Sequence, residues 1–127
     1  MSKVVLDASA LLALVNQEPG HTIVATMLPG ALASAVNISE LVAKLTDQGM
    51  PQSEVQELLV TLSLTIVPFD QDQGILAGYL RHITKQFGLS LGDRACLALG
   101  MKTQCLVVTT DKIWAKLDIN VGIQVIR

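Results

Sequence analysis

The chain has 127 residues, an ordinary length for one domain, and we expect residues 1–127 to form a single domain. Half of the residues are apolar and only 16% are charged, which excludes a disordered chain. The formal net charge is −2 and only 3% of the residues are aromatic, which argues against nucleic-acid binding through bulk positive charge or base stacking.

The N-terminal apolar run is interrupted by Asp7 before it is long enough for a signal peptide. No apolar stretch approaches the roughly 18 residues needed to span a bilayer. We therefore expect a soluble, cytoplasmic protein without membrane association.

Short runs rich in β-branched residues alternate along the chain with longer segments of helical composition. We expect strands at residues 3–6, 31–36, 64–69, 105–110 and 122–127. We expect helices within residues 8–20, 21–30, 37–49, 53–63, 70–86 and 90–103, and a short helical turn at residues 111–117. The alternation predicts right-handed crossovers, and the near-continuous apolar strands predict a sheet covered on both faces. The expected fold is α/β, with a central, mainly parallel sheet between two helical layers.

Four acidic residues occupy comparable places beside the predicted strands. Asp7 directly follows the first strand and Asp111 directly follows the fourth. Glu40 lies in the first turn of the predicted helix after the second strand. The carboxyl ends of parallel strands share one edge of a sheet, and ligand sites form there where the strand order reverses. We therefore expect these three acids at one edge.

The fourth acid, Asp93, lies in the first turn of the helix that begins at Ser90. By simple alternation the helix that leads into the fourth strand begins at the opposite edge. Topology alone therefore does not bring Asp93 to the other acids, unless the preceding segment crosses the fold.

If these acids converge, their repulsion would raise the pKa of some of them until they take up a proton, unless a cation neutralises them. Two carboxylates about 4 Å apart repel by roughly 4 kcal/mol at an effective dielectric constant of about 20, and a divalent ion removes that penalty. Oxygen ligands without Cys or His select a hard cation, which points to Mg²⁺ or Mn²⁺.

Each acid also has a structural explanation as a helix cap. Asp7 can cap the helix that follows it, and the acid after the fourth strand can do the same. The pairs Asn37–Glu40 and Ser90–Asp93 have the three-residue spacing of a capping box. Caps explain each acid alone but do not explain why they would share one location.

Four segments that together cover nearly the full chain carry a family resemblance. They are VVLDASALLAL, SAVNISELVAKL, LSLGDRACLALG and LVVTTDKIW, and in this order they resemble a PIN-domain protein of the bacterial VapC toxin type. The resemblance implies a three-layer α/β/α fold in which Asp93 does reach the other acids. It also implies a Mg²⁺-dependent endoribonuclease of a toxin–antitoxin pair, which leaves a 5′-phosphate and a 3′-hydroxyl.

The same resemblance assigns catalytic and metal-ligating roles to the four acids. Asp7 and Asp93 would be the principal metal ligands. Glu40 would bind the metal directly or through water, or orient the attacking water. Asp111 would support a metal or its water.

Ser9, Thr109 and Arg94 match the family's motifs beside the site, and Lys112 flanks the expected edge. Ser9 and Thr109 would donate hydrogen bonds to the acids or to a phosphate oxygen, and their alternative role is local capping. Arg94 and Lys112 would bind substrate, and their alternative role is that of ordinary surface cations. The net negative charge implies that few residues contact RNA.

The implied partners are RNA, a cognate antitoxin and a second copy of the chain. The helices within residues 53–63 and 70–86 carry more apolar positions than one core face needs. By resemblance such helices form dimer and antitoxin surfaces, whereas from the residues alone they are core.

Other functions fit the sequence less well. A haloacid-dehalogenase-type phosphatase would need a second Asp at the position of Ser9. A response-regulator receiver would need an acidic doublet near the first strand and a phosphoacceptor after the third, where Asp70 is displaced. A PIN-like module that binds RNA or protein without cleaving remains an alternative, although all four family acids are present.

Overall fold

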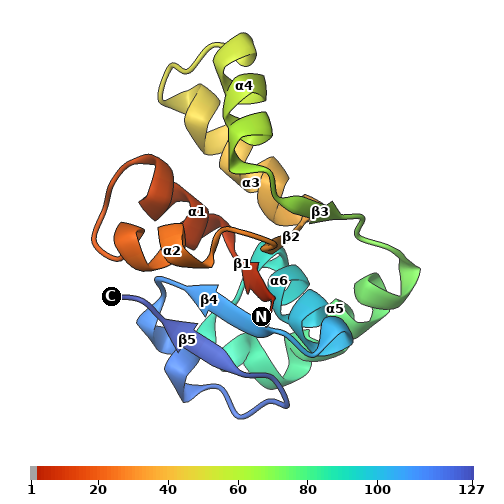
Figure 1. The fold of residues 1–127 in the computed structure, drawn as a ribbon. Helices are drawn as coiled ribbons and strands as arrows, with labels where there is room; N and C mark the ends of the chain where they lie inside the picture. The colour runs from red at the N-terminus through yellow and green to blue at the C-terminus, as the bar shows by residue number, and fades with distance from the viewer. Residues whose placement is uncertain (1–2) are drawn as a thin grey trace.

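The computed structural model describes residues 3–127, and its elements alternate as the sequence predicts (Figure 1). The strands are β1 (Val4–Leu6), β2 (Leu32–Ser34), β3 (Thr65–Val67), β4 (Leu106–Thr109) and β5 (Ile123–Val125). The helices are α1 (Ala8–Val15), α2 (His21–Met27), α3 (Ala35–Asp47), α4 (Gln52–Leu62), α5 (Gln71–Thr84) and α6 (Leu91–Thr103), with the 3₁₀ helices η1 (Lys85–Phe87) and η2 (Lys112–Lys116). In this part of the chain, no helix combines the length and apolarity that a bilayer crossing needs.

The strands form one sheet in the order β3-β2-β1-β4-β5, and every strand pair in the described residues is parallel. Val5 in β1 lies opposite Leu32 in β2 on one side and Val107 in β4 on the other. The direction of strand addition thus reverses between β1 and β4. In parallel α/β sheets, such a reversal opens a crevice at the carboxyl ends of the strands.

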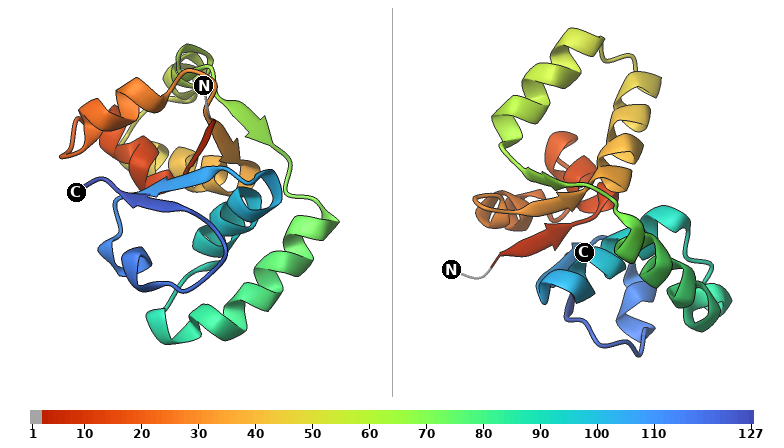
Figure 2. Two further views of the ribbon diagram at one scale, coloured as in Figure 1. Left: turned by 60° about the horizontal axis from the view of Figure 1, so that its bottom comes forward. Right: turned by 90° about the vertical axis from the view of Figure 1, so that its right-hand side faces the viewer.

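Alternate residues of the strands enter two separate cores. Val4 and Leu6 pack with residues of α1, α2, α3 and α4, whereas Val5 packs with residues of α5, α6 and η2. The two further views show helices on both sides of the sheet (Figure 2). The predicted three-layer α/β/α architecture is therefore confirmed.

The boundary between β2 and α3 differs from the prediction. The strand ends at Ser34, and Ser34 caps α3 by accepting a hydrogen bond from the Val36 N–H at 3.2 Å. The prediction that Asn37 caps this helix and that Glu40 lies in its first turn is wrong. Ser34 supplies an equally good capping oxygen three residues earlier. Asn37 and Glu40 consequently lie inside α3, on a surface that faces α6.

The expectation that α6 begins at the edge opposite to Asp7 is also wrong. Only Gln104 and Cys105 separate α6 from β4, so the carboxyl end of the helix lies beside the amino end of the strand. A helix with so short a connection must run antiparallel to the strand that it enters. The amino end of α6, with Asp93, therefore lies at the carboxyl edge of the sheet.

Candidate functional site

The structure places all four acids around one pocket at the carboxyl edge of the sheet. The pocket has a volume of about 190 Å³ and lies where the strand order reverses between β1 and β4. The residues that line it are Asp7, Ala8, Ser9, Leu12, Asn37, Glu40, Lys44, Asp93 and Asp111. We call this site the acid pocket.

Asp7 is the most deeply buried acid of the pocket, with 4% of its surface exposed. It caps α1, as one reading of the sequence predicts, because its Oδ1 accepts from the Ala10 N–H at 2.8 Å. Oδ1 also accepts from the Ser9 hydroxyl at 2.7 Å, and Oδ2 accepts from the Thr109 hydroxyl at 2.6 Å.

The pKa of Asp7 is raised to about 6, chiefly by burial and to a smaller extent by the nearby charge of Asp93. The hydrogen bonds from Thr109, Ser9 and the Ala10 N–H oppose this rise because they stabilise the carboxylate. Asp7 is thus a buried carboxylate whose charge the surrounding donors only partly compensate. Such a group gains from a cation in the pocket.

The two predicted hydroxyl residues connect the ends of β1 and β4. Besides its bond to Asp7, Ser9 Oγ accepts from the Thr110 N–H at 3.0 Å. Thr109 Oγ1 accepts from the Asp111 N–H at 3.1 Å. These bonds fix the backbone after β4 relative to Asp7, and so they fix the starting point of the Asp111 side chain.

Asp93 and Asp111 each use one carboxylate oxygen as a helix cap. Asp93 Oδ2 accepts from the Ser90 N–H at 3.0 Å in the predicted capping box, and Asp111 Oδ1 accepts from the Ile113 N–H at 3.0 Å. Capping and a role in the pocket are therefore compatible. Among residues 3–127, the other oxygen of each side chain accepts no hydrogen bond.

Glu40 is oriented by Asn37, one turn earlier on α3. The Asn37 amide Nδ2 donates to Glu40 Oε1 at 2.9 Å and to the Gly92 carbonyl of α6 at 3.0 Å. Asn37 Oδ1 is buried and finds no partner within the described residues. This amide was missed by the sequence analysis, which treated Asn37 only as a cap.

The donor set of the acid pocket fits a hard divalent cation. The four carboxylates are all oxygen donors, and no His or Cys lines the pocket. Within residues 3–127, no three His, Cys, Asp or Glu side chains form a ready-made coordination group. Mg²⁺ commonly retains several waters and binds one or two carboxylates directly, so waters can bridge the remaining acids.

Lys44 is the second pocket residue that the sequence analysis missed. It lies four residues after Glu40, on the same face of α3, and its side chain is exposed at the pocket. Among the described residues it takes part in no ion pair. The four-residue spacing from Glu40 was the available signal, because residues i and i+4 are neighbours on a helix surface.

Three of the residues expected to bind substrate, Thr109, Arg94 and Lys112, do not line the pocket. Thr109 is fully buried, and its hydroxyl donates to Asp7 instead. The Arg94 guanidinium donates through Nη1 to the Ala77 carbonyl at 2.9 Å, so it connects α6 to α5. Lys112 is exposed beside Asp111 but lies outside the pocket lining. Arg94 is thus a partly buried connection between two helices, and the expectation of a substrate-binding residue or an ordinary surface cation did not include this role.

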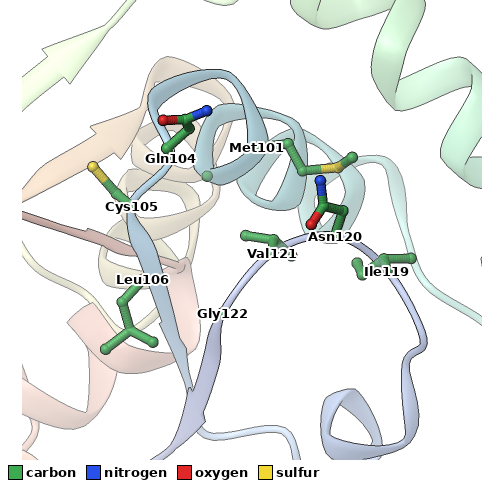
Figure 3. A pocket seen from close by; sticks show the side chains of 9 residues that line it. Met101, Gln104, Cys105, Leu106, Ile119, Asn120, Val121 and Gly122 are labelled. Atoms are coloured by element: carbon green, nitrogen blue, oxygen red, sulfur yellow. The ribbon is translucent and has the colours of Figure 1, made fainter.

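A larger pocket of about 600 Å³ lies at the amino edge of the sheet, between the end of α6, the start of β4 and the segment before β5 (Figure 3). Its lining includes Gln104, Cys105 and Asn120, and none of the lining residues is charged. It therefore offers no carboxylate to bind a divalent cation and no cationic side chain to neutralise a phosphate.

Comparison with known proteins gives a family and a set of similar folds. A family model described as PIN domain matches residues 4–120, and no curated protein sequence matches the chain. A toxin–antitoxin complex from Klebsiella pneumoniae has a TM-score of 0.76 at 18% identity, with 98% of both chains covered. DNA-bound VapBC from Salmonella typhimurium has a TM-score of 0.76 at 16% identity, with 100% of both chains covered. Mycobacterium tuberculosis VapC20, described as a sarcin–ricin loop cleaving toxin, has a TM-score of 0.75 at 18% identity, with 94% of this chain and 98% of that chain covered.

Proposed function

This chain belongs to the PIN-domain family, and we propose that it is a metal-dependent endoribonuclease, the toxin of a toxin–antitoxin pair, acting in the cytoplasm. The observation that carries the proposal is the meeting of Asp7, Glu40, Asp93 and Asp111 in one pocket at the point where the strand order reverses. The similar folds support the toxin assignment, because they include toxin–antitoxin complexes and a toxin described as cleaving an RNA loop.

The cofactor in this proposal is Mg²⁺, with Mn²⁺ as a substitute. When bound, it would polarise a phosphoryl oxygen and lower the pKa of a water molecule. Asp7 and Asp93 would be its principal ligands. Glu40 and Asp111 would bind it directly or through water, and Ser9 and Thr109 would keep Asp7 in the required orientation.

The reaction is hydrolysis of an RNA phosphodiester. The water oxygen forms a bond to phosphorus, the bond from phosphorus to O3′ breaks, and O3′ takes up a proton. The products are a 5′-phosphate and a 3′-hydroxyl, and the 2′-hydroxyl takes no part. Of the basic residues near the pocket, Lys44 is the better placed to bind a non-bridging phosphate oxygen, with Lys112 farther out.

The proposed partners are a cognate antitoxin and a second copy of the chain. On α5 the side chains of Ile75, Tyr79 and Ile83 are spaced four residues apart and are 49%, 74% and 52% exposed. Such a stripe has no partner within the described residues and is apolar enough to bury in an interface. If it forms the dimer, the wild-type chain should have twice the monomer mass in light scattering and Tyr79→Glu should be monomeric. A monomeric wild-type chain would remove the homodimer from the proposal.

The direct test is cleavage of total cellular RNA by the purified chain. We expect cleavage with Mg²⁺, with ends that carry a 5′-phosphate, and no cleavage with EDTA or in Asp93→Asn. Asp118→Asn is a matched control, because Asp118 is an exposed acid outside the pocket and its loss should leave cleavage intact.

The same experiment separates the alternatives. RNA that is bound but remains intact with Mg²⁺ would favour a non-cleaving PIN-like module. Turnover of a generic phosphomonoester together with intact RNA would favour a small phosphohydrolase. Equal cleavage by Asp93→Asn and the wild-type chain would overturn the proposed site.

A further inference from the structure

The Glu40 carboxylate has a defined seat made by residues of two helices. Asn37, only 1% exposed, donates from one amide group both to Glu40 Oε1 at 2.9 Å and to the Gly92 carbonyl at 3.0 Å. The amide therefore links the α3 acid to the amino end of α6, one residue before Asp93. A Glu side chain free of such contacts would sample several rotamers.

Gly92 forms the other side of this seat. A Cβ added at Gly92 would overlap both carboxylate oxygens of Glu40. The backbone of Gly92 does not have a positive φ, so its conformation does not require glycine. Gly92 is the second residue of α6, a position at which the helix itself gains nothing from glycine over alanine. The absence of a side chain at this position is therefore best explained by the space that Glu40 occupies.

The Asn37 amide is also incompletely satisfied, because its buried Oδ1 has no partner among the described residues. A buried acceptor without a hydrogen bond destabilises the fold. Two neighbouring positions in α3 and α6 thus carry residues that stability alone does not favour, and both contact Glu40.

We propose that Asn37 and Gly92 are positioning residues, which hold the Glu40 carboxylate against the amino end of α6 so that it shares the pocket with Asp93. The functional part of this inference rests on the proposed nuclease function. Neither residue touches the reacting atoms. They act by fixing in advance where the Glu40 charge lies, which spares the enzyme the cost of ordering it during the reaction.

The test is a double-mutant cycle of Gly92→Ala and Glu40→Ala, measured by thermal unfolding and by cleavage of total cellular RNA with Mg²⁺. We expect Gly92→Ala to remain folded, because the overlapping atoms are the flexible end of the Glu40 side chain. Its rate at saturating RNA should fall about 10- to 100-fold, the range seen when residues that orient metal ligands are lost. The RNA concentration at half-maximal rate should change little.

In the Glu40→Ala background, Gly92→Ala should have different effects on the cleavage rate and on the melting temperature. Gly92→Ala should cause no further loss of cleavage, because the displaced carboxylate is already absent. It should change the melting temperature more favourably than it does in the wild-type chain, because the overlap is gone. Asn37→Asp, which keeps the side-chain shape but donates neither bond, should match the rate of Gly92→Ala.

Gly78→Ala is the control, because Gly78 also lies in a helix and a Cβ there meets no atom within 4 Å. It should leave the cleavage rate unchanged. Wild-type cleavage by Gly92→Ala, or an equal loss with and without Glu40, would overturn the positioning role.

The thermal cycle does not need enzymatic activity. If the wild-type chain cleaves no RNA, the proposed function fails, and coupling between positions 92 and 40 in melting temperature still decides whether Glu40 occupies this seat. If the changes in melting temperature caused by Gly92→Ala and Glu40→Ala are simply additive, the two residues are not in contact and the proposed position of Glu40 is wrong.

Discussion

The two edges of the sheet differ in what they offer a ligand. At the amino edge, the start of β4 borders a pocket of about 600 Å³ without a charged residue in its lining. At the carboxyl edge, the end of β4 borders a pocket of about 190 Å³ that four carboxylates line. The smaller pocket is the candidate site, because it lies where the strand order reverses and collects like charges that need a cation. Charge and position in the topology, rather than volume, identify the site.

The largest expected effect is that of Asp7→Asn on cleavage. The substitution removes a charge proposed to bind the metal, which is worth several kcal/mol of transition-state stabilisation, or about 10² to 10⁴ in rate. Asn120→Ala in the amino-edge pocket should leave the rate unchanged. Rates measured on total RNA, with circular dichroism to confirm folding, test both. Full cleavage by folded Asp7→Asn, or a comparable loss in Asn120→Ala, would remove the contrast between the edges.

The second-largest expected effect is a pH dependence of the free energy of unfolding, caused by Asp7 and measured without divalent metal. Burial raises the pKa of Asp7 from 3.8 to about 6, so the folded chain binds an additional proton between these pH values. The free energy of unfolding should therefore fall as pH rises from about 4 to about 6, by about 3 kcal/mol from this group. Asp7→Asn should lack this component. Urea unfolding in EDTA at several pH values gives the comparison, and parallel curves for the two proteins would show that Asp7 is not the cause.

Sequence patterns placed Asp7, Glu40 and Asp111 at the carboxyl edge because those patterns are local. An Asp directly after a buried strand must lie at the carboxyl edge, which placed Asp7 and Asp111. The Ser90–Asp93 spacing predicted the observed capping box. The edge reached by Asp93 was misjudged from topology, because the antiparallel run of α6 into β4 was overlooked, and only the family resemblance brought it into the group.

Residues that depend on contacts between helices were not accessible from the sequence. Ser34 competes with Asn37 for the cap of α3, and the choice depends on where β2 ends. The contact of Asn37 with Gly92 spans 55 positions along the chain. The same holds for Arg94, whose partner is a backbone carbonyl of α5 that no side-chain pattern reveals.

A smaller decrease in the rate of RNA cleavage is expected from Thr109→Val. This substitution keeps the shape of the side chain and removes its hydrogen bond to Asp7. Loss of an outer contact to a metal ligand typically costs about 10- to 100-fold, so cleavage should fall by that factor. Thr103→Val is a control near the amino end of β4, since the Thr103 hydroxyl at the end of α6 donates to the Leu99 carbonyl of its own helix. An equal fall in both variants would indicate general destabilisation rather than a role at the carboxyl edge.

The smallest effect belongs to Gln104, beside the amino-edge pocket. It ends α6 in a left-handed conformation with φ of 56°, which favours glycine. Gln104→Gly should raise the free energy of unfolding by about 0.5–1 kcal/mol and leave cleavage unchanged. Urea unfolding and the RNA assay measure the two quantities. A decrease in cleavage would assign the amino edge a role that its chemistry does not suggest.

The most direct measurement is anomalous X-ray scattering from a crystal of this chain soaked in Mn²⁺. We predict anomalous density inside the acid pocket, within coordination distance of a carboxylate oxygen of Asp7 or Asp93, and its loss in Asp93→Asn. A well-ordered crystal whose pocket shows no such density, or whose Mn²⁺ binds only elsewhere, would contradict the account.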